Sequence, residues 1–349
     1  MNRCRAVVFT LPLAFAIGTA AVTAAAPALA VRPATAPTKD QAAAGWLARQ
    51  LTGRSHLVTV FNGSKFPNQG GTIDAIFAFA ATHAASDYAA RAVTWLQKPS
   101  VLTGYIGDTK NGFFAGATAK VALAAEVSGI SPTSFGKTNL IARLGSLLTK
   151  SGRYSDQSSF GDFSNAFSQS LAILAFSRHG GAPATAVGFL VRSECKNGGF
   201  PLNFAQKTCV SDPDATGMVV QALLAAGRKI AASRGLHWLA KAQHSDGGFA
   251  ASATAAPNAN STGLAGDALA AGHWTHRAAL AAKFLLGLQV GCSAPAKRRG
   301  AIAFDATGFK ASTAVSATAQ GILGIADVPL WKLSSHGASS GAPRLGCAS

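Results

Sequence analysis

Two carboxyl groups lie in one short segment, Ser211-Asp212-Pro213-Asp214-Ala215-Thr216, where their spacing could serve chemistry. A carboxyl group can exchange a proton with a ligand, and burial decides which form it takes at neutral pH. The same segment suits the start of a helix. Asp212 is a favoured N-cap, Pro213 is a favoured first helical residue, and Asp214 in the first turn complements the helix dipole. The residue types alone therefore predict a helix that begins here.

The chain around this segment repeats with a period of about 48 residues. A helical pattern that ends at Gln243 is followed by the turn Asp246-Gly247-Gly248-Phe249, and a similar turn recurs as Asn197-Gly198-Gly199-Phe200. Trp46 and Trp95, in two further helical patterns, are 49 residues apart. Two helices and one turn in each period are typical of a helical repeat array, in which every unit buries its apolar face against its neighbours.

Apolar residues at helical spacing predict about twelve helices, alternately outer and inner, and hence an all-α fold. The predicted outer helices cover residues 40–51, 87–98, 139–150, 184–192, 229–243 and 276–289. The predicted inner helices cover residues 72–84, 118–129, 165–178, 215–226, 262–271 and 316–325. The inner set is apolar nearly all round, as helices covered on both sides must be.

The spacing Gln243-x-x-Asp246-Gly247-Gly248-Phe249 resembles the QW-type repeat of terpenoid cyclases. The same turn occurs in protein prenyltransferase β subunits and cobalamin carriers. This resemblance implies a closed α6/α6 toroid with six inner/outer helix pairs. It does not decide the function, because toroids of this kind host cyclisation, prenyl transfer and plain ligand binding.

The segment Asp212-Pro213-Asp214-Ala215-Thr216 resembles the Asp-x-Asp-Asp-Thr motif of class II terpenoid cyclases, with Ala215 in place of the last Asp. The resemblance implies that Asp214 would donate a proton to an alkene or epoxide, with Asp212 beside it. Because Ala215 leaves the motif incomplete, we expect instead that the central cavity binds an apolar or amphipathic ligand, such as an isoprenoid-like molecule; a class II cyclase is the alternative. The residues expected to line that cavity are Phe77, Phe167, Thr216, Met218 and Thr262.

The N-terminal sequence suggests export. Arg3 and Arg5, a short apolar run over 6–17 and the small residues Ala28-Leu29-Ala30 are typical of a secretory signal peptide. We expect residues 1–30 to be removed, 31–38 to be a disordered linker, 39–330 to form the toroid and 331–349 to form a tail. A membrane anchor is the alternative, but the run is broken by Pro12 and is shorter than a span requires. The expected protein is a secreted monomer.

Four cysteines remain after the predicted signal peptide, which is an even number in a chain expected to be exported. Three pairings are possible. We favour Cys195 with Cys209, which would close the loop around Gly198-Gly199-Phe200, and Cys292 with Cys347, which would tie the tail back. No Cys-x-x-Cys motif is present and no His lies at ligand spacing from these cysteines, so no metal site is predicted. No cofactor is predicted either.

The sequence is strongly basic, with 31 basic and 14 acidic residues and a formal net charge of +17. Most basic residues are scattered along the predicted outer helices, and the one run, Lys297-Arg298-Arg299, has no aromatic residues interleaved with it. This pattern argues against a nucleic-acid platform. An anionic cell-envelope surface is the macromolecular partner that such a charge would suit.

Overall fold

The computed structural model describes residues 36–252 and 254–347, and its compact unit begins at Pro37. The predicted signal peptide over 1–30 and residues 31–35 of the predicted linker lie outside the described residues. In the part of the chain that is described, no helix is both long and apolar enough to cross a bilayer.

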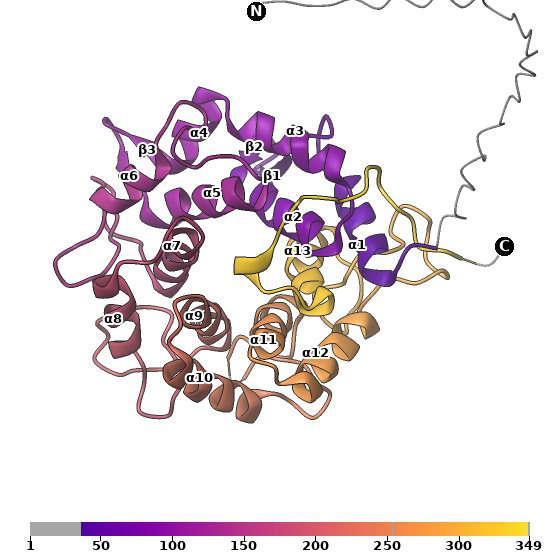
Figure 1. The fold of residues 1–349 in the computed structure, drawn as a ribbon. Coiled ribbons are helices and arrows are strands. Elements are labelled where there is room, and N and C mark those ends of the chain that lie inside the picture. The colour runs from indigo at the N-terminus through magenta and orange to yellow at the C-terminus, as the bar shows by residue number, and fades with distance from the viewer. Residues whose placement is uncertain (1–35, 253, 348–349) are drawn as a thin grey trace, which may run out of the picture. The chain divides into compact units, whose positions relative to one another are not determined.

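Six inner helices form a closed ring (Figure 1). They are α2 (Gln69–Thr82), α5 (Ala115–Val127), α7 (Ala166–Arg178), α9 (Pro213–Ala225), α11 (Ala259–Ala271) and α13 (Ala311–Ala326). Each packs against the next, and α13 packs against α2, which closes the ring. The outer layer contains α1 (Lys39–Ala48), α3 (Ser86–Leu96), α6 (Leu140–Ser146), α8 (Ala184–Arg192), α10 (Lys229–Ala242) and α12 (Thr275–Gly287). The predicted all-α toroid is confirmed, and every predicted helix is present.

Small residues let the inner helices approach closely. A side chain at Gly217 of α9 would lie 2.9 Å from the carbonyl oxygen of Leu264 in α11, and one at Gly263 of α11 would overlap the backbone of Gln320 in α13. Because these contacts leave no room for a Cβ atom, the glycines fix the spacing of the ring on this side.

Several elements lie outside the predicted helical pattern. They are α4 (Pro99–Ile106), the antiparallel hairpin of β1 (Leu57–Phe61) and β2 (Ser64–Asn68), the short pair β3 (Gly107–Asp108) and β4 (Gly112–Phe113), and the 3-10 helix η1 (Leu330–Lys332). The β1–β2 hairpin turns at Asn62-Gly63, both with positive φ. An Asn-Gly pair is a strong local hairpin signal, which a search for helical spacing does not detect.

The turn around Gly247 joins three helices. Gly247 has φ +91°, and a Cβ atom there would overlap the carbonyl oxygen of Leu280 in α12. The amide of Phe249 donates to Oγ1 of Thr262 in α11 (2.8 Å). Gln243, at the end of α10, donates from Nε2 to the carbonyl of Gly247 (3.0 Å) and to that of Arg277 in α12 (2.9 Å). The residues of the Gln-x-x-x-Gly-Gly-Phe pattern therefore connect neighbouring repeats through hydrogen bonds and close contacts.

The same turn geometry occurs at four positions. The first residues are Gly152, Gly198, Gly247 and Gly300, each with φ +91°. Two residues later, the amides of Tyr154, Phe200, Phe249 and Ile302 donate to side chains of inner helices, at Gln169, Thr216, Thr262 and Thr318 respectively. Thr216 and Thr262, expected to line a cavity, are instead fully buried and hold these turns. The turns at Gly152 and Gly300 lack the Gly-Gly-Phe letters, which is why the sequence pattern missed them.

The last turn closes the ring. A Cβ atom at Gly300 would lie 2.8 Å from the carbonyl oxygen of Ala42 in α1. Gln289, after α12, donates from Nε2 to the carbonyl of Lys39 in α1 (2.7 Å). The contact that joins neighbouring repeats thus also joins the last repeat to the first.

The inner helices begin at one end of the ring, which we call the amino end. The first amide of α5, at Ala115, donates to Asp156 in the connection that leads into α7 (2.7 Å). The first amide of α7, at Ala166, donates to the carbonyl of Leu202 in the connection that leads into α9 (2.9 Å). The start of each of these inner helices therefore lies beside the connection that leads into the next inner helix.

The opposite, carboxyl end of the ring is covered by the chain after α13 (Figure 1). The amide of Leu330 in η1 donates to Oε1 of Gln221 in α9 (2.9 Å), and the amide of Ser335 donates to the carbonyl of Val127 in α5 (2.9 Å). Leu330 is buried. The segment that we expected to be a tail thus packs across the ends of the inner helices.

Both predicted disulfides are confirmed. Cys195 is bonded to Cys209, with their Cα atoms 5.5 Å apart, and Cys292 is bonded to Cys347, with their Cα atoms 5.7 Å apart. The first bond restrains the loop that leads into α9, and the second fixes the end of the chain to the connection before α13.

Candidate functional site

The Asp-rich segment begins α9, as its residue types predict. Asp212 is the N-cap, and one of its carboxylate oxygens accepts a hydrogen bond from the amide of Ala215 (2.8 Å). Pro213 is the first helical residue. The amide of Asp212 donates to the carbonyl of Phe200 (2.9 Å), so the Gly-x-Phe turn also positions this side chain.

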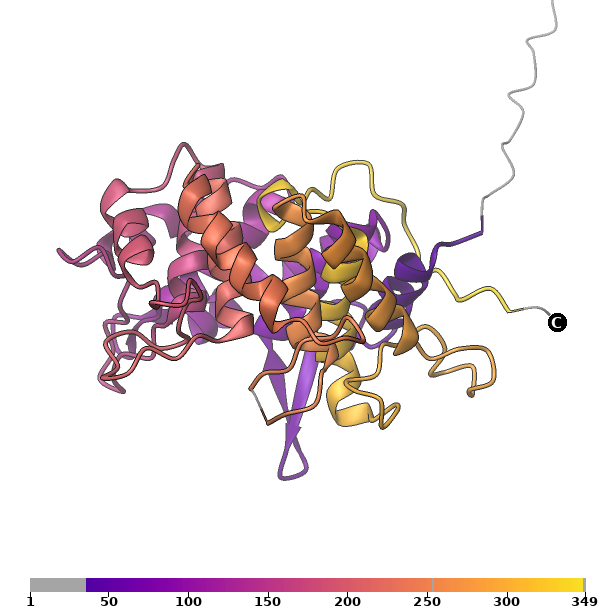
Figure 2. The ribbon, with the colours of Figure 1, turned by 90° about the horizontal axis from the view of Figure 1, so that it is seen from below.

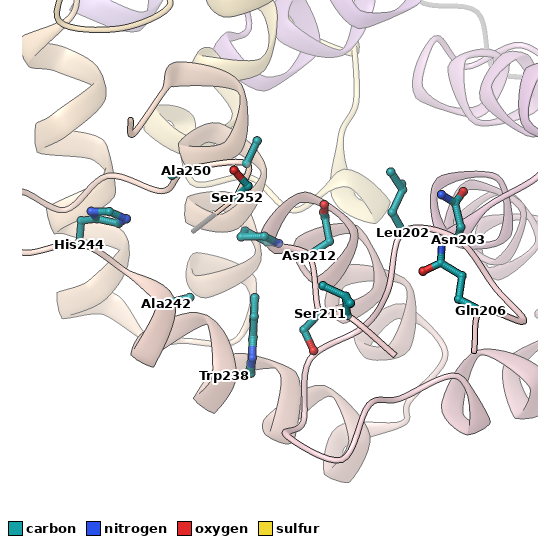
Figure 3. A pocket seen from close by; sticks show the side chains of 13 residues that line it. Leu202, Asn203, Gln206, Ser211, Asp212, Trp238, Ala242, His244, Ala250 and Ser252 are labelled. Atoms are coloured by element: carbon teal, nitrogen blue, oxygen red, sulfur yellow. The ribbon is translucent and has the colours of Figure 1, made fainter. Parts of the chain in front are cut away.

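Asp212 lines a groove of about 530 Å³ at the amino end of the ring (Figure 3). One wall comes from the loop before α9, and the other from α10 and the loop after it. The apolar lining residues are Leu202, Val210, Pro213, Trp238, Ala242, Ala250 and Ala251, and the polar ones are Asn203, Gln206, Ser211, Asp212, His244 and Ser252. A volume of this size and a mixed lining are typical of small-molecule sites.

Burial changes the chemistry of Asp212. Desolvation raises the pKa of its carboxyl group, and hydrogen bonds from the amides of Ala215 and Asp214 oppose part of that rise. In Figure 3, Asn203 and Gln206 lie on one side of Asp212, with Ser252 and His244 on the other. The groove therefore combines a partly desolvated carboxyl group, two amides and an aromatic wall.

The loop between Cys195 and Cys209 separates this groove from a second one of about 440 Å³. Asn203 and Gln206 line both grooves. The ring of Phe204 packs edge-on against Phe189 of α8, with centroids 4.9 Å apart. The disulfide and this aromatic contact hold the loop in place, so that its amides face the two grooves.

Asp214 does not line the groove. Its pKa is raised to about 6, because desolvation and, less strongly, the nearby Asp212 raise it by more than a hydrogen bond from Ser261 at the start of α11 lowers it. Its Oδ1 atom is buried and accepts no hydrogen bond from the described residues. The two carboxyl groups therefore have different surroundings: Asp212 faces the groove, and Asp214 lies towards α11.

Two charged side chains lie just beyond the first turn of neighbouring inner helices. Asp74 in α2 and Lys120 in α5 remain partly exposed, although their helical neighbours are buried. Asp74 and Lys120 form an ion pair of 2.7 Å, with side chains 27% and 19% exposed. Desolvation lowers the pKa of Lys120, but Asp74 and Tyr105 raise it by more, so the ammonium form is stabilised. The wall of the ring thus carries a charge pair.

The other residues expected in a central cavity pack in the core. Phe77 and Met218 are buried, and Phe167 is partly buried against the same core. None of the three lines either groove at the loop before α9. The groove residues Trp238, Asn203 and Gln206 were not predicted as a site. The loop that the Cys195–Cys209 pair encloses is the sequence signal that could have pointed to Asn203 and Gln206.

Comparisons with known proteins bear on the fold. No protein-family model and no curated protein matches the sequence. Among solved structures, the type II terpene cyclase MstE from Scytonema is similar over 82% of this chain and 96% of its own, with a TM-score of 0.62 at 14% identity. A protein from Actinoplanes has a TM-score of 0.61 at 15% identity over 83% of this chain and 98% of its own. The chain therefore folds as an α/α toroid.

A third similar structure is an unsaturated glucuronyl hydrolase specific for heparin, with a TM-score of 0.54 at 11% identity over 83% of this chain and 95% of that one. Toroids of similar shape thus act on chemically unrelated molecules, and identities this low establish the fold alone.

Among the described residues, no group of three or more His, Cys, Asp or Glu side chains is placed to hold a metal ion.

Proposed function

We propose that this protein binds an amphipathic small molecule in the groove beside Asp212. The observation that carries this proposal is the division of the groove lining. Leu202, Val210 and Trp238 offer apolar surface, while Asp212 and Asn203 offer hydrogen-bonding groups. An apolar chain, including an isoprenoid one, would lie along the first set.

The polar side of the groove favours a headgroup with hydroxyl groups. A carboxylate accepts hydrogen bonds, and the amides of Asn203 and Gln206 both accept and donate them. An anionic headgroup would be repelled by Asp212, whereas a sugar or polyol supplies donors and acceptors without charge. We therefore propose an amphiphile with an uncharged, hydroxyl-bearing headgroup.

Calorimetric titration of residues 31–349 with octyl glucoside, octanol and glucose tests this function. Octyl glucoside is expected to bind at least about tenfold more tightly than either of its parts, because only it fills both sides of the groove. Trp238→Ala removes apolar contact of about 2 kcal/mol and is expected to weaken binding about thirtyfold. Asp212→Asn keeps a good N-cap and is expected to weaken the binding of octyl glucoside and glucose more than that of octanol, because the sugar carries most of the hydroxyl groups.

Trp274→Ala is the matched control. Trp274 is also half-buried and packs against His237, with ring centroids 4.9 Å apart, but it lies outside the groove. Its replacement should leave the affinity unchanged. Equal losses in the Trp238 and Trp274 variants, or equal affinities for octyl glucoside and glucose, would overturn the proposed site.

A terpenoid cyclase activity is the second candidate, and the surroundings of Asp214 favour it. A partly buried carboxyl group with a pKa of about 6 and a buried, unpartnered oxygen holds its proton more readily than an ordinary Asp. Against it stands Ala215, which replaces a carboxyl group of the motif that this segment resembles.

Incubation with squalene and linear polyprenyl substrates decides between the candidates. We expect no cyclised product from the wild type or from Asp214→Asn. If Asp214 is a general acid, the wild type will form a product and Asp214→Asn will form it about 10² to 10⁴ times more slowly. That result would replace ligand binding with catalysis as the function.

We also propose that the protein works outside the cytoplasm. Its two disulfides support this, because such bonds persist in oxidising compartments. The N-terminal sequence of the protein secreted by its own host would test it, with Val31 as the expected first residue.

A further inference from the structure

The large apolar side chains that remain exposed are concentrated at the amino end of the ring. The most exposed are Val60, Phe61, Phe66, Phe160, Phe163, Val210 and Ile230. All except Ile230 lie in connections that lead into inner helices, namely those before α2, α7 and α9. Ile230 is at the start of α10, directly after α9 ends, and therefore lies at the carboxyl end.

The β1–β2 hairpin carries three of these residues away from the ring (Figure 2). Within residues 36–252 and 254–347, its strands pair with no other strand. Phe61 lies opposite Ser64 and Phe66 opposite Thr59, so both phenyl rings occupy one face of the hairpin, and they are 66% and 51% exposed. An isolated hairpin is marginally stable in water, and this one places aromatic side chains in solvent near its tip. Such exposure indicates a surface that is covered in use.

Positive charge surrounds these apolar residues. Exposed basic residues of all the connections at this end include Lys65, Lys110, Lys150, Lys196, Lys207, Lys297, Arg298 and Lys310. Acidic residues are fewer there: Asp162 and Asp246 are exposed, Asp108, Asp156 and Asp305 are half-exposed, and Asp162 forms an ion pair with Arg153 (3.0 Å). The amino end therefore offers aromatic tips on a cationic background.

We propose that the amino end of the ring docks on an anionic lipid surface. Aromatic side chains are favourable at the depth of lipid headgroups, and exposed lysines are attracted by anionic lipids. The apolar residues project from three separate connections, at Phe61, Phe160 and Val210. The hairpin reaches beyond the other connections (Figure 2), and a fluid lipid surface can deform to contact all three, whereas a protein partner would need a matching contour. This inference does not depend on the ligand of the groove, although Val210 belongs to both.

Co-sedimentation with lipid vesicles tests the docking surface. Residues 31–349 are expected to bind vesicles of phosphatidylcholine mixed with an equal amount of phosphatidylglycerol, and to bind phosphatidylcholine alone at least about tenfold more weakly. The double variant Phe61→Ser/Phe66→Ser is expected to lose at least about tenfold in partition, because two phenyl rings no longer leave water. Added salt should weaken binding, because it screens the lysines.

Ile230→Ser is the matched control, since Ile230 is as exposed as the hairpin residues but lies at the other end. It should bind mixed vesicles like the wild type, and so should Trp238→Ala, which separates docking from ligand binding. Wild-type protein that fails to bind the mixed vesicles would overturn the proposal, as would equal losses in the hairpin and Ile230 variants. Capture of a protein partner by the hairpin, without vesicle binding, would assign this surface to that partner instead.

Discussion

Replacing Gly247 with Ala is expected to lower the free energy of unfolding by about 3 kcal/mol or more. Two costs combine. The φ of +91° is unfavourable for a residue with a side chain, which costs about 1 kcal/mol. The new Cβ atom would also overlap the carbonyl oxygen of Leu280, so α12 must shift away from the turn, at a further cost of about 2 kcal/mol. Urea unfolding monitored by circular dichroism measures the sum.

Gly308→Ala separates the two costs. Gly308 has a similar φ of +95°, but nothing lies within 4 Å of the position of its Cβ atom. This variant should lose only the conformational part, about 1 kcal/mol. Gly291→Ala, at a position with neither positive φ nor close neighbours, should be neutral. If the Gly247 and Gly308 variants lose equal stability, the contact of the turn with α12 is not required by the fold.

Asp214 is expected to make the protein less stable as the pH rises from about 4 to about 6. Its pKa in the folded protein is about 6, compared with 3.8 for an ordinary Asp, so the folded state binds this proton more tightly. The contribution of this proton to the free energy of unfolding is complete below pH 4 and is lost as the pH rises through 6. The difference between the two pKa values corresponds to at most about 3 kcal/mol of that free energy.

Asp214→Asn should remove this pH dependence, because the amide stays neutral throughout. The variant is then expected to match the wild type at pH 4 and to melt at a higher temperature at pH 7. A position in the first turn of a helix would by itself predict the opposite, a slight loss of stability at pH 7. Melting temperatures across this pH range distinguish the two outcomes.

Asp108→Asn is a control of opposite sign. The amide of Asn111 donates to the carboxylate of Asp108 and lowers its pKa, with smaller effects from its other neighbours. The contribution of the Asp108 carboxylate to stability is therefore present at neutral pH and is lost as the pH falls below the usual pKa range of Asp.

The Asp214 prediction is wrong if Asp214→Asn leaves the dependence of the melting temperature on pH unchanged. That result would show that the Asp214 carboxyl group is solvated in solution.

Local residue types in the sequence determined where helices form, and at α9 also where the helix begins. Asp212-Pro213 starts α9 as predicted, because N-cap and first-turn preferences act within a few residues. Helical spacing located the six inner and six outer helices, since each buries an apolar face. The favoured disulfide pairs are also confirmed: Cys195–Cys209 closes the loop around Gly198-Gly199-Phe200, and Cys292–Cys347 ties the end of the chain to the connection before α13.

The tertiary structure alone decided what the candidate residues contact. Asp212 is the extended N-cap of α9 and Asp214 lies in its first turn, and only the tertiary packing shows that Asp212 faces the groove while Asp214 lies towards α11. Thr216 and Thr262 are polar residues on inner helices, which made them candidates for a cavity. Their hydroxyl groups instead accept hydrogen bonds from amides 16 and 13 residues earlier in the chain. Partners at that distance follow from how the turn folds back on the helix, which helical spacing does not encode.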